Sequence, residues 1–420
     1  MSGNANERAT ALRRSFPENF SFRRKTMIEK ESMKSRLPER LLALGLLAMF
    51  AGVGSHFAFA RDGMTAAGAT ESWNPKSAAS YLDQRANWWI GWKDAAREQG
   101  TFCISCHTAA PYALARPALH RALAENSPTE NERVIFENVA KRVRLWKELA
   151  PLYNDKDYGA NKGVESRGTE SVVLTFVLAM HDAQSGKLSD DTRTAFNNMW
   201  GLQQTEGPSK GAWLWQLFDL NPWEGNISPY HGATLAAIAV GEAPENYRAR
   251  PEIQKNIVAL REYLNREYSA QPLVNRATLL WASSALPGVI TPERQKSIVE
   301  ELSARQQTDG GWSLFPLSKT WHDWSPSALA GEWKRKDGTP EDLSSDGYAT
   351  GLAVFVLRRA GVPRVDPRIR RGRAWLVQHQ NKTEGLWYTA SINKRRDPAS
   401  NAGRFMSDAA TAYAVLALSD

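Results

Sequence analysis

Short apolar segments rich in alanine and glycine recur along the chain. Each is apolar around nearly its whole circumference when drawn as a helix, so each is expected to be buried on most sides. Their small side chains allow helices to approach closely. Five segments show this pattern clearly, and the stretch that follows a cysteine pair is a sixth: 107–115, 169–179, 231–240, 276–286, 346–357 and 408–418.

Longer amphipathic segments alternate with these apolar ones. In 133–149, for example, Val139, Val143 and Trp146 follow helical spacing. Six such segments are expected as outer helices: 77–99, 133–149, 190–203, 253–268, 292–306 and 366–380. Six outer helices alternating with six inner ones predict an all-α fold, a single (α/α)6 toroid over residues 77–420. Residues 61–76 are expected to be an irregular lead-in.

A second repeat follows three of the outer segments. The clearest copy runs from Gln306 to Trp312 and reads Gln-Gln-Thr-Asp-Gly-Gly-Trp. A second copy ends at Gly385 and Trp387, and a third begins at Gln203 and reaches Trp213 after a small insertion. Glycine turns the chain at a helix end, tryptophan covers that end, and glutamine binds loose backbone groups. The repeat is therefore predicted to fasten neighbouring hairpins together.

The residues from Arg371 to Trp387 follow the pattern R-G-x2-W-L-x3-Q-x4-G-x-W. This pattern resembles the QW motif of squalene-hopene and oxidosqualene cyclases. The Q-x2-D-G-G-W form also occurs in protein prenyltransferase β-subunits of the same superfamily. The resemblance covers residues 160–420 and implies an α/α toroid with an apolar central cavity that suits an isoprenoid ligand. Residues 77–160 are assigned to the same toroid only because the alternation of inner and outer helices extends through them.

The catalytic motifs of that superfamily are matched poorly. Terpenoid cyclases protonate an alkene with a D-x-D-D motif. The matching stretch here retains only Asp346, with Ser344 and Gly347 at the other acidic positions. The prenyltransferases use zinc held by Asp, Cys and His, but no cysteine follows Cys106, so no zinc is expected. Asp346 and Asp408 remain candidate catalytic acids. The alternative is that each only caps or charges the start of its helix.

The only two cysteines, Cys103 and Cys106, are followed directly by His107. The pattern C-x-x-C-H is typical of c-type haem attachment: two thiols bond the porphyrin, and the imidazole reaches the iron. A covalently bound haem c is therefore predicted. His231 is a candidate second ligand of the iron. The alternatives are five-coordinate iron without a second ligand and a role for His231 as a plain polar cap. Other readings of the motif are a different metal, a redox or disulfide pair and a structural thiol pair.

Further residues near the starts of the inner segments are expected to line the cavity. The expected set is Tyr112, Glu170, Tyr230 and Tyr348, with Trp213, Trp215, Trp321 and Trp324 from loops above them. Plain packing is the alternative for each aromatic residue. The segment 319–338 is expected to be an insertion that acts as a lid, a membrane-facing loop or an idle surface loop.

Charge is concentrated in the leader. The chain carries a net +8, but residues 1–60 hold ten Lys and Arg against five Glu, so the remainder is only about +3. No nucleic-acid partner is therefore expected. Lys34, Arg36 and Arg40 precede the apolar stretch 41–54, and Ala58-Phe-Ala60 follows it, as in a Sec-type signal peptide. Residues 1–60 are read as leader, of which 1–32 represent an over-long start.

Cleavage of that signal predicts an extracytoplasmic protein, in a bacterial periplasm; an uncleaved membrane anchor is the alternative. Three function hypotheses follow. The first is an exported toroid with an apolar ligand, a rim haem and redox chemistry that needs a redox partner. The second is a terpenoid cyclase or isoprenoid-modifying enzyme that uses Asp346 or Asp408. The third is a non-catalytic electron-transfer or binding scaffold, so enzymatic activity is left open. Peripheral membrane contact is expected in any of these cases.

Overall fold

The computed structural model describes residues 72–319, 335 and 337–419. The chain divides into Met1–Thr65 and Ala66–Asp420, and the first unit lies wholly outside the described residues. The predicted signal peptide therefore lies outside them, as does most of the lead-in. All described residues belong to the second unit.

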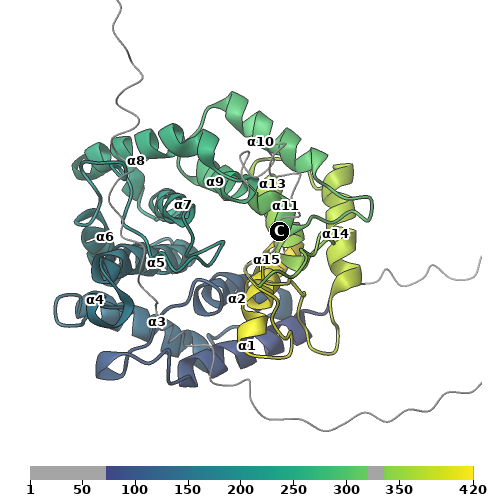
Figure 1. Ribbon diagram of the computed structural model, residues 1–420, viewed down its shortest axis with the longest axis horizontal. Coiled ribbons are helices and arrows are strands. Elements are labelled where there is room, and N and C mark those ends of the chain that lie inside the picture. Colours follow the sequence, from purple (N-terminus) through teal and green to yellow (C-terminus); the bar gives the residue numbers. More distant parts are fainter. Residues whose placement is uncertain (1–71, 320–334, 336, 420) are drawn as a thin grey trace, which may run out of the picture. The chain divides into compact units, whose positions relative to one another are not determined.

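The described residues form a ring of alternating inner and outer helices (Figure 1). The inner helices are α2 (Ala109–Leu123), α5 (Lys162–Ser185), α7 (Ser228–Glu242), α9 (Leu273–Ala285), α13 (Gly347–Arg359) and α15 (Phe405–Ser419). The outer helices are α1 (Pro75–Gly91), α3 (Glu130–Arg144), α6 (Asp190–Trp200), α8 (Gln254–Glu267), α10 (Pro292–Ala304) and α14 (Pro367–His379). The connections hold α4 (Asp155–Tyr158), α11 (Leu314–Ser318) and the 3-10 turns Glu98–Gly100, Tyr247–Ala249, Pro251–Ile253, Tyr268–Ala270 and Ala402–Arg404. The predicted all-α toroid of six outer and six inner helices is confirmed.

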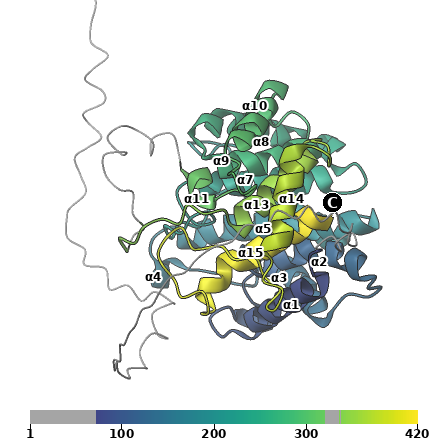
Figure 2. The same ribbon diagram turned by 90° about the vertical axis from the view of Figure 1, so that its right-hand side faces the viewer.

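The ring closes between its first and last hairpins. Each inner helix packs against the next, and α15 packs against both α2 and α1. Figures 1 and 2 both place α15, coloured yellow, beside the dark blue α1 and α2. Residues from the two ends of the folded region therefore meet on one side of the ring. Within the described ranges, no helix has the length and apolar content needed to cross a membrane.

Side-chain size decides which helices are inner. Nearly every residue of α7, α13 and α15 is buried. α7 and α15 are rich in alanine, and α13 combines glycine and alanine with branched residues. Such helices can pack on both neighbours and on the outer layer at once. The outer α3, by contrast, buries one stripe that includes Ile135, Val139 and Val143.

The repeated glutamines bind two hairpins at once. Gln306 Nε2 donates to the Gly310 carbonyl of its own loop at 2.8 Å and to the Arg368 carbonyl at the start of α14 at 2.9 Å. The same paired contacts join Gln203 to Gly211 and Asn256, and Gln380 to Gly385 and Asn74. Each glutamine therefore links one outer helix to the next, and Gln380 links the last to the first.

The repeated tryptophans bind back to the helix that precedes them. Trp213, Trp312 and Trp387 are fully buried. The indole nitrogen of Trp312 donates to the Leu302 carbonyl of α10 at 2.7 Å. The other two donate in the same way to Met199 and Leu376. The predicted fastening role of this repeat is confirmed by these contacts.

Several helix boundaries were predicted wrongly. The first outer helix ends at Gly91 rather than Gln99, because the backbone becomes extended at Trp92 (ψ 122°). The segments predicted at 107–115 and 133–149 form helices over Ala109–Leu123 and Glu130–Arg144. The inner helix α5 begins at Lys162, so Glu170 lies in its interior and not in its first turn. The apolar pattern marks only the buried part of α5, and its polar first turns extend beyond that part.

Candidate functional site

The Cys103–His107 segment is held firmly between the turn after α1 and the start of α2. Cys103 N donates to the Ala95 carbonyl at 2.9 Å, and Trp89 Nε1 donates to the Cys103 carbonyl at 2.7 Å. Ser105 Oγ accepts from the backbone nitrogens of Thr108 and Ala109, at 3.2 and 2.9 Å, where α2 begins. The backbone that carries both thiols and the imidazole is therefore fixed by its own hydrogen bonds.

Both thiols and the imidazole open onto one internal cavity. Its free volume is about 50 Å³, which is smaller than that of a typical ligand pocket. Its remaining walls include Trp89, Tyr153, Arg142, Glu170, Gln216 and Glu224. Cys106 and Val173 also line a second, mostly apolar cavity of about 30 Å³, which contains His231. The structure thus brings Cys103, Cys106, His107, Glu170 and His231 to two neighbouring cavities.

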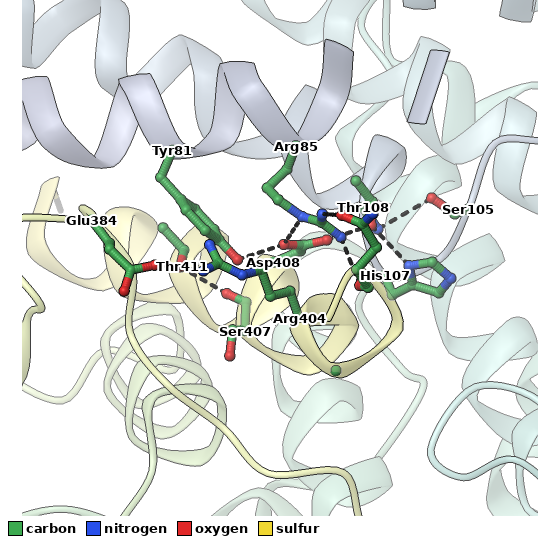
Figure 3. A network of polar contacts seen from close by, with 12 residues as sticks. Tyr81, Arg85, Ser105, His107, Thr108, Glu384, Arg404, Ser407, Asp408 and Thr411 are labelled. Carbon is green, nitrogen blue, oxygen red and sulfur yellow. Dashed lines mark hydrogen bonds and ion pairs between the residues drawn. The ribbon is translucent and has the colours of Figure 1, made fainter. Parts of the chain in front are cut away.

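A chain of hydrogen bonds connects His107 to Asp408 (Figure 3). His107 Nδ1 lies 2.9 Å from Thr108 Oγ1, and the Thr108 hydroxyl donates to Asp408 Oδ2 at 2.6 Å. Arg85 Nε and the Tyr81 hydroxyl both donate to Asp408 Oδ1, at 2.8 and 2.7 Å. Asp408 therefore receives three donors, which suits an ionised carboxylate.

This arrangement fixes the proton on the His107 ring. The single hydroxyl proton of Thr108 goes to Asp408, so Thr108 Oγ1 can only accept from Nδ1–H. Burial, with Arg85 nearby, lowers the pKa of His107 to about 3, so the ring is neutral. Its Nε2 therefore carries a free lone pair, and Figure 3 shows this nitrogen pointing away from the network.

Aromatic rings hold the imidazole in place. Phe405 stacks on it with ring centroids 3.8 Å apart, and Trp89 meets it edge-on at 5.0 Å. Trp223 lies 5.9 Å away on a loop above the cavity. The position of the His107 ring is thus set by packing as well as by hydrogen bonds.

The cysteines are not bonded to each other. Burial raises the pKa of the Cys103 thiol to about 11 and that of Cys106 further still. Neither thiol is ionised at neutral pH, which is unlike the low-pKa thiols of redox C-x-x-C sites. In the part of the chain that the structure describes, no group of three or more His, Cys, Asp and Glu is placed to hold a metal ion.

The two candidate catalytic aspartates lie outside both cavities. Asp346 is the N-cap of α13: it accepts from the backbone nitrogens of Ala349 at 3.0 Å and Leu314 at 2.5 Å and from the Thr389 hydroxyl at 3.1 Å. Burial raises its pKa to about 6 despite these donors. Asp408 lies in the first turn of α15 and is bound to Arg85. The geometry matches the capping and first-turn alternatives.

The predicted tyrosines do not line the two cavities. The Tyr112 hydroxyl donates to Asp83 at 2.6 Å, and the Tyr230 hydroxyl donates to the Leu264 carbonyl at 2.9 Å, so both are used in packing between inner and outer helices. Tyr348 lies between Trp223 and Tyr413, one shell behind the apolar cavity, which Trp223 and Tyr413 do line.

His231 has an unusual place among the buried polar residues. It lines the apolar cavity together with Cys106, and its ring makes no hydrogen bond with any described residue. Burial lowers its pKa to about 4, so the ring is neutral and both of its nitrogens are short of partners. The polar-cap alternative for His231 is therefore not supported by any contact.

Trp213 and Trp215, which were predicted to lie in loops above the cavity, are buried by packing and line neither cavity. The Trp215 indole donates to the Trp223 carbonyl at 2.7 Å. A Cβ at Gly232 would come within 2.2 Å of the Trp215 ring, so α7 depends on glycine there. Trp321, Trp324 and nearly all of the segment 319–338 lie outside the described residues.

Glu224 is the least expected residue of the site. It lines the cavity of the thiols, its carboxyl makes no hydrogen bond or ion pair within the described part of the chain, and burial raises its pKa to about 7. Arg142, Gln216 and Thr108 were also missed. No periodicity or motif singles out any of these four residues, since a loop and a fold-dependent contact bring them to the site.

No family model and no curated protein matches the sequence. Among solved structures, similar backbones include an inactive variant of the α-1,6-mannanase GH76A of Salegentibacter sp. HEL1_6 in complex with α-1,6-mannotriose. It is 10% identical, covers 82% of this chain and 100% of its own, and has a TM-score of 0.47. A second structure of that mannanase gives 11% identity, the same coverage and a TM-score of 0.46. At such identities the likeness is one of fold.

Proposed function

We propose that this chain is a c-type haem protein built on an α/α toroid, with Cys103 and Cys106 as the attachment residues and His107 as the iron ligand. The observation that carries the proposal is the Asp408–Thr108–His107 chain, which leaves His107 Nε2 free on a cavity that both thiols share. Ligand histidines are commonly oriented by such a bond on the opposite nitrogen.

The residues of the site fit this group. Two thiols can form thioether bonds, a neutral imidazole can bind iron, and His231 offers an unpartnered nitrogen in the adjoining cavity as a second ligand. Arg85 and Tyr81 donate hydrogen bonds to Asp408, and Asp408 accepts one from Thr108. Thr108 in turn orients the imidazole plane of His107. A bound haem would supply one-electron redox chemistry. The apolar cavity, with a free volume of about 30 Å³, would have to widen to take an apolar, isoprenoid-like ligand.

Haem attachment in bacterial cells tests the proposal. The full chain is expressed for export with and without the c-haem attachment machinery, and the purified protein is extracted with acidic acetone. We expect an absorption band that survives extraction in the wild type and is lost in the Cys103→Ala/Cys106→Ala double variant. A folded, exported wild type that lacks the band in the presence of the machinery would overturn the proposal.

Location and partners follow from the same proposal. A c-type haem is attached outside the cytoplasmic membrane, so we propose an extracytoplasmic protein, released or anchored by its leader, with a redox partner and peripheral membrane contact. Fractionation of cells, with detection of the chain in the periplasmic and membrane fractions, distinguishes the released from the anchored form.

Glu224 favours a second candidate function, acid–base hydrolysis. A carboxyl with its pKa raised to about 7 beside an ion-paired Glu170 resembles the unequal carboxyl pairs of glycoside hydrolases. Incubation with α-1,6-mannotriose and with aryl glycosides tests this candidate. Hydrolysis that is lost in Glu224→Gln would support it, and no turnover by the wild type would remove it.

The isoprenoid-modifying alternative rests on Asp346 or Asp408 as the acid. Both carboxylates are already bound by several donors, and this weakens the alternative. Incubation with squalene and polyprenyl diphosphates tests it, and turnover that persists in Asp346→Asn and Asp408→Asn would remove these two acids. A chain that loads haem but converts none of these substrates would support the non-catalytic scaffold.

A further inference from the structure

Two buried side chains on one wall of the thiol cavity have polar nitrogens without partners. Arg142 and Gln216 are 2% and 4% exposed and both line the cavity. Arg142 Nε binds Glu170 and its Nη1 donates to Thr101 Oγ1 at 2.6 Å, but Nη2 has no partner among the described residues. Gln216 Nε2 has none either. Both atoms are donors. An unpartnered acceptor on the same wall, Glu170 Oε2, forms an ion pair with Arg167 at 3.5 Å but no hydrogen bond among the described residues, so the two donors remain without an acceptor.

The charges around this wall point to an anion. Glu170 forms ion pairs with two arginines, Arg142 and Arg167. The distance from Arg167 Nη1 to Glu170 Oε2 is 3.5 Å. Two buried or half-buried guanidinium groups therefore share one carboxylate. A buried positive charge without a counter-charge is costly, and a ligand carboxylate would remove that cost. Glu224, on the same cavity, is the acidic group that this anion would have to avoid.

The neighbouring cavity defines the rest of the ligand. It begins at Cys106 and Val173, which line both cavities, and its walls include Leu114, Phe176 and Leu235. The free volumes of the two cavities are about 50 and 30 Å³, so a ligand that extends an apolar body from the first into the second must displace the side chains that separate them.

We propose that Arg142 and Gln216 form a carboxylate-binding subsite for a ligand whose apolar body lies toward the cavity of Phe176 and Leu235. This carboxylate has two chemical sources. If it is a propionate of the haem, the inference rests on the proposed function. If it belongs to a free carboxylic acid with an apolar tail, the inference is independent of the proposed function. Both sources need the same two donors.

The test compares Gln216→Leu with a matched control, Gln378→Leu, which changes an exposed glutamine on α14. The haem-free full chain is titrated with dodecanoate by calorimetry. The haem-loaded full chain is titrated for its redox midpoint potential. Arg142→Lys is a second variant, since it keeps the charge near Glu170 but removes Nη2. Thermal unfolding of each variant confirms that it is folded, and extractable haem is measured separately.

The outcomes separate the sources. If the carboxylate is free, the haem-free wild type binds dodecanoate and Gln216→Leu weakens binding by about tenfold, the loss expected for a hydrogen bond to a charged group. If it is a propionate, dodecanoate does not bind, and the haem-loaded Gln216→Leu has a lower midpoint potential than the wild type and Gln378→Leu. If haem fails to attach, the proposed function is contradicted, and the dodecanoate titration alone then decides whether the carboxylate subsite exists. The subsite is refuted if dodecanoate does not bind and no haem-loaded variant shifts in potential.

Discussion

Asp408 is the residue on which the candidate site depends most, although 300 positions separate it from Thr108. Its carboxylate is fully buried, pairs with Arg85 and receives the Thr108 hydroxyl. In the sequence it is only an acid near the start of an apolar segment. Its position at the seam of the ring makes it a positioning residue for His107.

Removal of the Asp408 charge should destabilise the whole fold. Asp408→Asn leaves the Arg85 guanidinium buried without a counter-charge, which typically costs about 3–5 kcal/mol. Urea unfolding of the haem-free chain measures this loss. The double variant Arg85→Met/Asp408→Leu removes both charges and should recover much of it. Equal losses of unfolding free energy in the single and double variants would show that Asp408 does not stabilise the fold through its ion pair with Arg85.

Thr108 provides a finer test of how the imidazole is oriented. Thr108→Val removes the hydroxyl and leaves His107 Nδ1–H and one Asp408 oxygen without a partner, at a cost of about 1–3 kcal/mol. Thr108→Ser keeps the hydroxyl and should behave like the wild type. In the haem-loaded chain, the valine variant should bind added imidazole about tenfold more tightly, because His107 is displaced more readily. Identical imidazole titration curves for the two variants would refute an orienting role.

Glu224 should make stability depend on pH in a defined window. Its pKa is raised to about 7 in the folded chain from an ordinary value near 4.5, so the folded state holds a proton that the unfolded state has lost. Its contribution therefore falls as pH rises from 4.5 to 7 and is constant above that. Glu224→Gln should match the wild type at about pH 4 and exceed it by about 2 kcal/mol at about pH 8. A constant difference between the two across this range would contradict the prediction.

At the scale of elements, the repeated glutamine is the most regular device in the fold. Gln203, Gln306 and Gln380 each bridge one outer helix to the next, so the ring has the same joint in three places. The sequence was sufficient to predict this joint, because spacing and residue type recur together.

Gln380 should be the most sensitive of these joints, since it alone ties the last outer helix to the chain before α1. Gln380→Met should lower the free energy of unfolding by about 1–3 kcal/mol, because the Asn74 backbone nitrogen loses its acceptor and the Asn74 carbonyl keeps only Ala78 N as a donor. Gln378→Met, two residues earlier and exposed, is the matched control and should have little effect. Urea denaturation followed by circular dichroism measures both. Similar midpoints for the two variants would show that the bridge contributes nothing.

The sequence predicted the elements better than the site, for a physical reason. Inner and outer helices differ in apolar pattern over many residues, so all twelve could be placed, although α1 ends early where Trp92 leaves the helix. Cys103, Cys106 and His107 were singled out because their spacing matches a known attachment pattern. Arg142, Gln216 and Glu224 reach the same cavity from an outer helix and a loop, and only the packing of neighbouring hairpins brings them there. Tyr112 and Tyr230 illustrate the converse, since their hydroxyls bind the outer layer.

At the scale of the whole molecule, the candidate site coincides with the closure of the ring. Tyr81, Arg85 and Thr108 from the first hairpin all meet Asp408 of the last helix. The site is therefore complete only when residues near both ends of the folded region have come together. It should be lost in the same cooperative transition that unfolds the ring, rather than as a separate module.

Closure also restricts when a haem could be attached. Cys103 and Cys106 open onto an internal cavity in the closed ring, so the folded chain should react slowly with any reagent that attacks thiols. The raised pKa of Cys103, about 11 against an ordinary 9.0, alone reduces its thiolate about a hundredfold. Alkylation with iodoacetamide, followed by mass spectrometry, should therefore be at least that much slower in buffer than in urea. On the proposed function, haem would therefore be attached before the ring closes. Haem added to the closed, haem-free chain should then form no covalent adduct, whereas the machinery acting during export should form one. Rapid alkylation of the folded chain, or a covalent adduct formed by simple addition of haem, would show that the ring opens at the seam under native conditions.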